Sequence, residues 1–162
     1  MQKQTYREVG NLKIYNKAFD LATKIFNEVK DLKEYSLRDQ IIRCSTSVFA
    51  NICEGYSFVD QYKAKYLNFL FNAYGSHNET KSWINFLAAV NLLDTDVKNE
   101  LMKEVDEINY MFVALINKVK DEIESENAVL KNKTLRVKTE FVKDISNIIQ
   151  DEDEDDFFRD VL

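Results

Sequence analysis

Apolar residues recur at intervals of three and four along most of this chain, which is the spacing of helices that bury one face. A first stripe runs from Leu12 to Leu32. A second stripe follows Ser36, whose hydroxyl can cap a helix N-terminus, and ends near Gly55, which can take the left-handed conformation common at helix C-termini. The pattern therefore predicts one helix over residues 12–32 and another that begins after Ser36 and ends near Gly55.

Two further stripes follow Asp60 and Asp94, and Thr95 is an equally suitable cap for the second of them. The third predicted helix contains Gly75, which costs about 1 kcal/mol relative to alanine in a helix interior, so we expect a close helix contact there. The fourth predicted helix has the most regular stripe of the chain, formed by Val97, Leu101, Val105, Ile108, Phe112, Leu115, Val119 and Ile123.

The pattern weakens after Asn127 and resumes near Leu135, which predicts a fifth, C-terminal helix over residues 128–150. The last segment, residues 151–162, reads DEDEDDFFRDVL and begins with six consecutive acidic residues. Mutual repulsion should keep this acidic tail disordered. Four striped helices with short connections, and no strand-like alternation, predict an all-α, antiparallel up-down-up-down four-helix bundle over residues 1–127, followed by the helical extension and the tail.

Composition adds limits on location and partners. The N-terminus lacks the apolar segment of a secretory signal, and no run of about 18 apolar residues could span a membrane, so we expect a cytoplasmic protein. The net charge is −6, but residues 1–81 carry twelve Lys or Arg against nine Asp or Glu, whereas residues 82–162 carry ten against nineteen. The first half is therefore where a basic face could meet nucleic acid.

The chain offers little for catalysis or metal binding. Cys44 and Cys53 stand in one predicted helix, about 13.5 Å apart along its axis, which is too far for a disulfide, so both are expected to be small core residues. The single histidine, His77, lacks the Glu-x-x-His spacing of di-iron bundles and the upstream arginine of helical ribonucleases of the HEPN class, so we expect it at the solvent or at an interface. No catalytic residue, metal, cofactor or small-molecule substrate is predicted.

A line of polar residues interrupts the apolar pattern on the second and third predicted helices. Steps of three and four place these residues on one face of each helix, and buried polar groups need partners. They could be catalytic, but no nucleophile or complete metal set is nearby, so we favour a structural network between helices or subunits, with Arg43 paired to Glu79. With two glycines, the predicted network consists of Arg43, Ser47, Asn51, Glu54, Gly55, Gly75, Ser76 and Glu79.

Candidate nucleic-acid contacts come from basic and aromatic residues. Aromatic rings can stack on bases, and Tyr56 and Phe58, near the connection between the second and third helices, are the rings to test. Core or interface packing is the alternative for the rings, and a solvated face is the alternative for the cations. The candidate phosphate-facing residues are Lys13, Lys17, Lys24 and Arg38.

Three segments together resemble a bacterial four-helix-bundle family first noticed as proteins encoded in intervening sequences of 23S rRNA genes. They are LKIYNKAFDLATKIF, IIRCSTSVFANICEGY and YLNFLFNAYGSHNET, and the resemblance spans roughly residues 10–125. The shared features are an arginine followed by small residues, the N-I-x-E-G run from Asn51 and the F-L-x-x-A-x-G-S-x-x-E line from Phe69. The resemblance implies an antiparallel bundle that assembles into a homopentameric ring.

Relatives in that family serve as accessory proteins of diversity-generating retroelements, where they bind reverse transcriptase and nucleic acid. The resemblance therefore implies RNA or DNA and a protein partner such as a reverse transcriptase. Two departures stand out, because Phe49 occupies a position where members often have proline, and Ser57, Phe58 and Val59 stand where members have basic residues. The extension beyond residue 125 is not explained by the resemblance, and a specialised partner would act there.

The acidic tail allows three roles. It could only keep the protein soluble, it could fold back and screen a basic face from nucleic acid, or its apolar end could dock on a basic partner. The docking residues would be Phe157, Phe158, Val161 and Leu162. We expect a non-enzymatic, oligomeric accessory or scaffold protein of a nucleic-acid-handling complex. The alternative is a protein–protein adaptor that acts through the acidic tail without binding nucleic acid.

Overall fold

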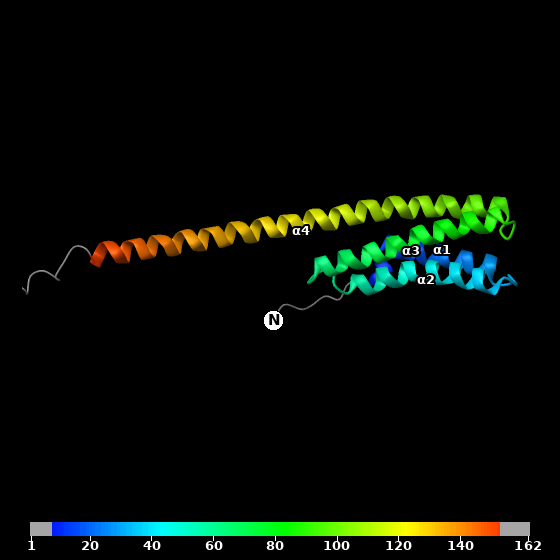
Figure 1. Ribbon diagram of the computed structural model, residues 1–162, viewed down its shortest axis with the longest axis horizontal. Helices are drawn as coiled ribbons and strands as arrows, with labels where there is room; N and C mark the ends of the chain where they lie inside the picture. Colours follow the sequence, from blue (N-terminus) through cyan, green and yellow to red (C-terminus); the bar gives the residue numbers. More distant parts are fainter. Residues whose placement is uncertain (1–7, 153–162) are drawn as a thin grey trace, which may run out of the picture. The chain divides into compact units, whose positions relative to one another are not determined.

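The computed structural model describes residues 8–152, with side chains up to residue 143 and at residue 146. A short 3-10 helix, η1 (Val9–Asn11), precedes α1 (Lys13–Val29), α2 (Tyr35–Tyr56), α3 (Lys63–Ala89) and α4 (Thr95–Glu152), as Figure 1 shows. These described residues contain no strand, so the predicted all-α class is confirmed. The chain divides into a first compact unit that ends at Asp121 and a second that begins at Glu122.

Helices α2 and α3 run antiparallel in the first unit. Ser76 of α3 hydrogen-bonds Ser47 of α2, and farther along α2 the backbone of Gly55 meets the earlier α3 residue Phe69. Because the contacts move forward along one helix and backward along the other, the two helices have opposite directions. This pairing brings the small residues of α2 against α3.

Helices α1 and α4 are antiparallel as well. Lys17 of α1 forms an ion pair with Glu107 of α4, and Lys24, two turns later on α1, pairs with the earlier Glu104. Helices α3 and α4 are antiparallel too, because Tyr74 of α3 contacts Asn109 of α4 and the later His77 contacts the earlier Val105. The three pairs together give the up-down-up-down order that the stripes predicted.

The core of the first unit consists of the apolar faces of all four helices. When the helices associate, their long apolar stripes are removed from contact with water. This burial is the main favourable contribution to the free energy of forming a bundle. The largest fully buried apolar side chains are Tyr66, Phe112, Ile25, Ile41, Ile52, Leu70, Ile84, Leu87 and Ile108.

Two of the predicted helix caps are wrong. Helix α2 begins at Tyr35, one residue before Ser36, and its N-cap Glu34 makes no side-chain cap bond. Helix α3 begins at Lys63, so Asp60 lies in the preceding turns and not at the cap position. The reason is that backbone turns after α2 continue through residue 62, which delays the start of α3.

The turn between α3 and α4 follows capping rules closely. The Asp94 carboxylate accepts a hydrogen bond of 2.7 Å from the Asp96 backbone N–H, which confirms the predicted cap of the fourth helix. Asn91 has a positive φ of 60° and ends α3. Its N–H bonds the Ala88 carbonyl and the Leu92 N–H bonds the Leu87 carbonyl, which together form a Schellman motif.

The two glycines of the predicted network have roles other than those expected. Gly55 lies inside α2 without a positive φ, so it is not a left-handed cap. It is instead a position of close approach to α3, because an added Cβ would lie 2.6 Å from the Phe69 Cβ. Gly75 is exposed, and an added Cβ would meet nothing within 4 Å, so the expected close contact is absent there among the described residues.

The C-terminal segment is helical, but it is not a separate helix. Helix α4 continues through Asn127 without interruption and ends at Glu152. The weakened apolar pattern is no helix stop, since the chain has neither proline nor glycine after Gly75. Of the acidic tail, only residues 151 and 152 are described, and both belong to α4. The predicted docking residues Phe157, Phe158, Val161 and Leu162 lie outside the described residues.

Candidate functional site

Three residues of the predicted polar network meet between α2 and α3. The Asn51 amide donates to the Ser47 carbonyl oxygen at 2.8 Å and to the Ser47 Oγ at 3.0 Å. The Ser76 hydroxyl reaches the same Ser47 Oγ at 3.1 Å across the helix interface. This small cluster satisfies its own polar groups and fixes the register of α2 against α3.

The charged residues of the predicted network are elsewhere. Arg43 donates to Gln40, one turn earlier on α2. Glu54 and Glu79 are exposed, and neither makes a hydrogen bond or ion pair with another described residue. The predicted Arg43–Glu79 pair is therefore not formed within residues 8–152.

His77 is fully buried, so the expectation of a solvent or interface position is wrong for the described chain. Its Nε2 lies 3.0 Å from the Val105 carbonyl oxygen. A carbonyl can only accept, so Nε2 carries the proton and Nδ1 is the bare acceptor, which has no partner among the described atoms. Burial lowers the pKa of His77 to about 4, which leaves the imidazole neutral near pH 7.

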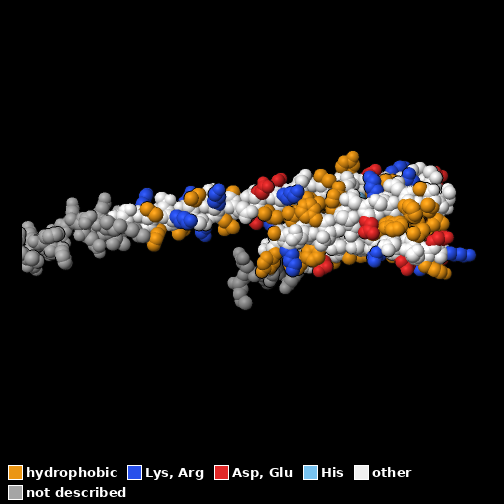
Figure 2. Space-filling model, viewed as in Figure 1, with side chains coloured by type: hydrophobic (Ala, Val, Ile, Leu, Met, Phe, Trp, Pro, Cys, Tyr) orange, Lys and Arg blue, Asp and Glu red, His pale blue; other side chains and the backbone are white. Residues whose placement is uncertain are grey.

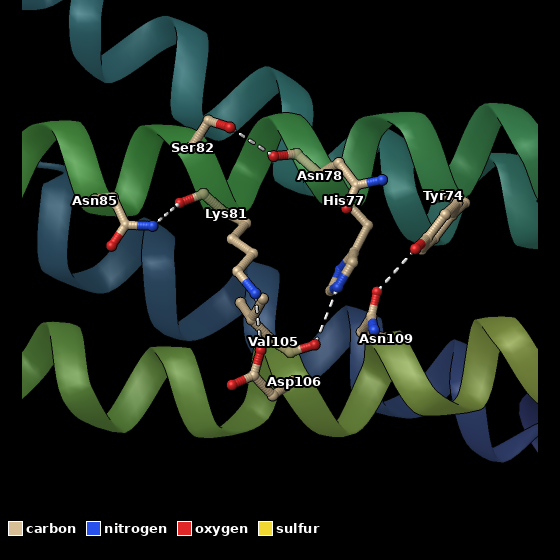
Figure 3. A network of polar contacts seen from close by, with 9 residues as sticks. All are labelled: Tyr74, His77, Asn78, Lys81, Ser82, Asn85, Val105, Asp106 and Asn109. Atoms are coloured by element: carbon tan, nitrogen blue, oxygen red, sulfur yellow. Dashed lines mark hydrogen bonds and ion pairs between the residues drawn. The ribbon is translucent and has the colours of Figure 1, made fainter.

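Polar contacts between α3 and α4 surround this histidine, as Figure 3 shows. The Tyr74 hydroxyl donates to the Asn109 amide oxygen at 3.0 Å, and the Lys81 ammonium pairs with Asp106 at 2.9 Å. The His77 ring also lies 5.6 Å from the Phe112 ring, measured between centroids. This arrangement joins helices, since the buried imidazole already uses its N–H on a backbone carbonyl.

The two cysteines differ in environment. Cys44 is buried as expected, and burial raises the pKa of its thiol. Cys53 is exposed, which corrects the prediction that both are core residues. Within the described residues no three His, Cys, Asp or Glu side chains come together in a way that could hold a metal ion.

Most of the predicted phosphate-facing cations already have carboxylate partners. Lys17 lies 2.8 Å from Glu107, and Lys24 pairs with Glu104. These hydrogen bonds and charges raise the pKa of both lysines. Arg38 binds the adjacent Asp39 at 3.1 Å. The face of α1 that contains Lys17 and Lys24 is therefore occupied mainly by salt bridges to α4, and most of its positive charge is neutralised.

The two candidate stacking rings pack within the bundle. Tyr56 lies edge-on to Tyr66 with ring centroids 6.4 Å apart. Phe58 stacks on Phe69 at 5.8 Å, and the Lys65 ammonium lies 3.9 Å from the centre of the Phe58 ring. Neither ring offers an open face on which a base could stack, so packing within the bundle describes both rings better.

A second basic segment was missed by the sequence analysis. Between residues 131 and 143 the only acidic residue is Glu140. The positive charge is visible as a local run in the sequence. It is lost when the net charge is counted over residues 82–162, because that half also contains nineteen acidic residues. The cations are exposed, and none of them forms an ion pair with another described side chain. They are Lys131, Lys133, Arg136, Lys138 and Lys143.

Exposed aromatic residues lie on the bundle. Phe19 of α1 and Phe49 of α2 form an edge-to-face pair with centroids 5.2 Å apart, and Tyr15 adds a third ring at 6.2 Å from Phe49. Phe19 is 46% exposed, and Phe26, two turns later on the same helix, is 47% exposed. Figure 2 shows apolar side chains gathered in patches over the bundle surface. Large contiguous apolar patches are common at the interaction surfaces of proteins.

Residues 10–114 match a protein family that is described as 23S rRNA-intervening sequence protein. A crystal structure of a protein of unknown function from the S23 ribosomal protein family of Bacteroides thetaiotaomicron is similar, with 28% identity and a TM-score of 0.59. The match covers 64% of this chain and 97% of that one. Curated proteins gave no match. No helix in the described part of the chain has the length and apolar character needed to cross a membrane.

Proposed function

Because this chain belongs to the 23S rRNA-intervening sequence protein family, we propose that it is a non-enzymatic, cytoplasmic helical-bundle scaffold in a nucleic-acid-handling complex. Its contact with RNA or DNA is on the basic segment of α4, residues 131–143. The protein partner is one such as a reverse transcriptase, and the scaffold itself is a homo-oligomer, a pentamer by family resemblance.

The observation that carries this proposal is the difference between paired and unpaired cations. A phosphate backbone attracts cations whose charge is not already neutralised, and binding gains from the release of its counterions. Lys17 and Lys24 each have a carboxylate at hydrogen-bond distance. Arg136, Lys138 and their basic neighbours have no described ion-pair partner. The favourable site for a nucleic acid is therefore the basic segment and not α1.

The oligomeric part of the proposal rests on the exposed aromatic residues of α1 and α2. A ring such as Phe19, 46% exposed beside Phe49, is energetically better placed in a subunit interface than in water. Native mass spectrometry tests this directly. Phe19→Glu should reduce the mass of the assembly to that of the monomer or a smaller oligomer. A wild-type monomer would exclude the ring.

The nucleic-acid contact is tested by reversing two cations on one face of α4. Arg136 and Lys143 stand seven residues apart, so they share a face. Arg136→Glu/Lys143→Glu should weaken binding to a single-stranded RNA and lower the slope of log K against log salt by about 1.4, for two lost phosphate contacts. Fluorescence anisotropy at several salt concentrations measures both.

Lys103→Glu/Lys118→Glu is the matched control, because it changes net charge equally at exposed positions on the same helix. Equal losses in the two variants would mean that only overall charge matters, which contradicts a site on the basic segment. If the wild-type protein binds no RNA or DNA at any salt concentration, the alternative of a protein adaptor acting through the acidic tail is favoured. Deleting residues 151–162 should then abolish capture of its protein partner.

A further inference from the structure

Beyond Glu122, the described part of α4 carries a stripe of apolar residues that no other described element covers. Leu130, Val137 and Phe141 follow one another at intervals of seven and four residues, which places them on one side of the helix. Their side chains are 60%, 58% and 64% exposed. Helices gain most of their stability when an apolar face packs, so this bare stripe is a surface on which another molecule can dock.

The stripe has the spacing of one helix of a coiled coil. Coiled coils repeat every seven residues, with two positions that face the partner helix and, beside them, two flanking positions whose charges select the partner. Leu130, Val137 and Phe141 occupy facing positions of one such repeat. At about 100° per residue, the residues in the flanking positions lie roughly 60° to 100° around the helix from Leu130. Between residues 131 and 143 they are Lys131, Lys133, Lys138 and Glu140.

Lysines dominate these flanking positions. Lys131 and Lys138 lie along one edge of the stripe, and Lys133 and Glu140 lie along the other. All four side chains are exposed, and none forms an ion pair with another described side chain. On the face in Figure 2, basic and apolar side chains cover the described C-terminal part of α4. A helix with carboxylates at its own flanking positions is therefore attracted to the stripe.

A second copy of this helix is a poorer occupant. A parallel copy would place Lys133 opposite Lys138 of the second copy, twice in the pair, because these flanking positions meet in parallel coiled coils. An antiparallel copy that sets stripe against stripe would place Lys131 opposite Lys138, again twice. These repulsions offset the attraction that Glu126 or Glu140 could supply to a lysine of the second copy. An acidic helix instead meets all three lysines with opposite charge.

A lipid surface also fits less well. A helix that lies on a membrane has one wide apolar face and carries its cations on the opposite side. Here Leu135 and Val142 form a second apolar pair, roughly 120° to 140° around the helix from Leu130. Lys131 and Lys138 stand between the two sets, so the apolar residues form no single face.

We propose that the C-terminal part of α4 forms a coiled coil with an acidic amphipathic helix of a different protein. The apolar residues of that helix pack on the stripe of α4. Its carboxylates lie opposite Lys131, Lys133 and Lys138, and one of its basic residues lies opposite Glu140. Burial of the stripe supplies affinity, and the flanking charges select the partner.

The nucleic-acid contact of the proposed function uses another side of the same helix. Arg136 and Lys143 lie roughly 120° to 140° around the helix from Leu130. A partner helix on the stripe therefore leaves both cations available to phosphates. The two proposals can fail separately, because the coiled coil requires no nucleic acid.

Two synthetic peptides of about four heptads test the charge selection. Both have leucine and isoleucine at the facing positions, and they differ only in carrying glutamate or lysine at the flanking positions. The full-length protein should bind the glutamate peptide at least about tenfold more tightly, as measured by fluorescence anisotropy. The net charge of the protein is −6, so overall charge disfavours this peptide and the preference must be local. Equal binding, or tighter binding of the lysine peptide, would overturn the proposal.

Serine substitutions test whether the stripe is the surface that binds. Leu130→Ser/Val137→Ser should weaken binding of the glutamate peptide at least about tenfold. Leu135→Ser/Val142→Ser is the matched control, since these residues are 54% and 61% exposed but lie away from the stripe, and it should bind as wild type does. Equal affinities of the two variants contradict docking on the stripe.

Charge reversal tests the flanking lysines with a gain of binding. Lys131→Glu/Lys138→Glu should reverse the preference, so that the lysine peptide binds more tightly than the glutamate peptide. Arg136→Glu/Lys143→Glu changes the net charge equally but lies off the flanks, so it should keep the preference for the glutamate peptide while RNA binding weakens. If both variants shift the peptide preference equally, the flanking lysines do not select the partner and the proposal fails.

The other two occupants are tested with the same stripe variant. Native mass spectrometry should give Leu130→Ser/Val137→Ser the wild-type mass per assembly, apart from the substitutions. A smaller assembly would show that a second copy covers the stripe. Vesicles of phosphatidylcholine with phosphatidylserine should bind wild type and variant equally, whereas binding lost only in the variant would show a lipid surface on the stripe. Either of these contrary results would overturn the proposal. None of these measurements contains nucleic acid, so their failure is distinct from failure of the proposed function.

Discussion

The backbone of Gly55 in α2 lies against the side chain of Phe69 in α3, at a distance that leaves no room for a Cβ. A Cβ at this position would be 2.6 Å from the Phe69 Cβ and 3.3 Å from the Tyr66 ring. Small residues earlier on α2, among them Ser47, meet α3 through side-chain hydrogen bonds. The close approach of these two helices therefore explains why this part of the sequence is rich in small residues.

The two helical glycines should respond to alanine in opposite ways. Gly55→Ala should lower the free energy of unfolding by about 1–3 kcal/mol, because the methyl group must displace Phe69. Gly75→Ala should raise it by up to about 1 kcal/mol, because the site is open and alanine favours the helix. Urea denaturation followed by circular dichroism measures both. A stabilised Gly55→Ala variant would show that the α2–α3 contact can relax.

Asn91 should be replaceable by glycine but not by a branched residue. Its φ of 60° allows the Schellman motif that ends α3. Asn91→Val should cost about 1–2 kcal/mol of stability, since a β-branched residue is strained in the left-handed region. Asn91→Gly should be neutral or slightly stabilising. The same denaturation experiment distinguishes them, and equal stability of the two variants would contradict a requirement for positive φ.

The helices were predictable because burial follows sequence spacing directly. Leu101, Val105, Ile108 and Phe112 belong to the stripe predicted for the fourth helix, and all are buried. The same rule could have located His77. The buried face of α3 continues through positions 73, 77, 80 and 84 at intervals of three and four, so position 77 belongs to it. Residue type led to the wrong expectation, because histidine is fully buried less often than the apolar residues are.

The candidate site was less predictable, because ion pairs between helices depend on register. The sequence places Lys17 and Lys24 on one side of a helix, but it does not say that Glu107 and Glu104 lie opposite. That information comes from how α1 and α4 pack. Likewise, nothing in the local sequence distinguishes Gly55, which touches another helix, from Gly75, which touches none.

Lowering the pH from about 6.5 to 4 should reduce the free energy of unfolding because of His77. Burial lowers its pKa from 6.5 to about 4, so over this range the unfolded chain binds a proton that the folded chain does not. This destabilisation is negligible well above pH 6.5 and reaches roughly 3 kcal/mol near pH 4. Urea denaturation at a series of pH values measures it.

His77→Gln is the control for this pH dependence, because it removes the titrating group while keeping a donor that can reach the Val105 carbonyl. His77 is the only histidine of the chain, so the variant should lose most of the slope between pH 6.5 and 5. Carboxylates titrate mainly below that range. An unchanged slope in the variant would mean that His77 is not the group responsible.

Removing two carboxylates should create the basic face that the sequence suggested on α1. Glu104→Gln/Glu107→Gln leaves Lys17 and Lys24 without their ion-pair partners, next to the exposed Lys13. The variant should bind single-stranded RNA more tightly than wild type at low salt, and its slope of log K against log salt should steepen by up to about 1.4.

Asp31→Asn/Glu79→Gln gives the same change in net charge at exposed positions without releasing a lysine. Anisotropy measurements on both variants separate local from global charge, because long-range effects are screened beyond roughly 8–10 Å at physiological salt. A gain confined to the Glu104/Glu107 variant would show that the carboxylates of α4 neutralise α1. Equal gains would mean that the ion pairs do not hold these lysines away from phosphate.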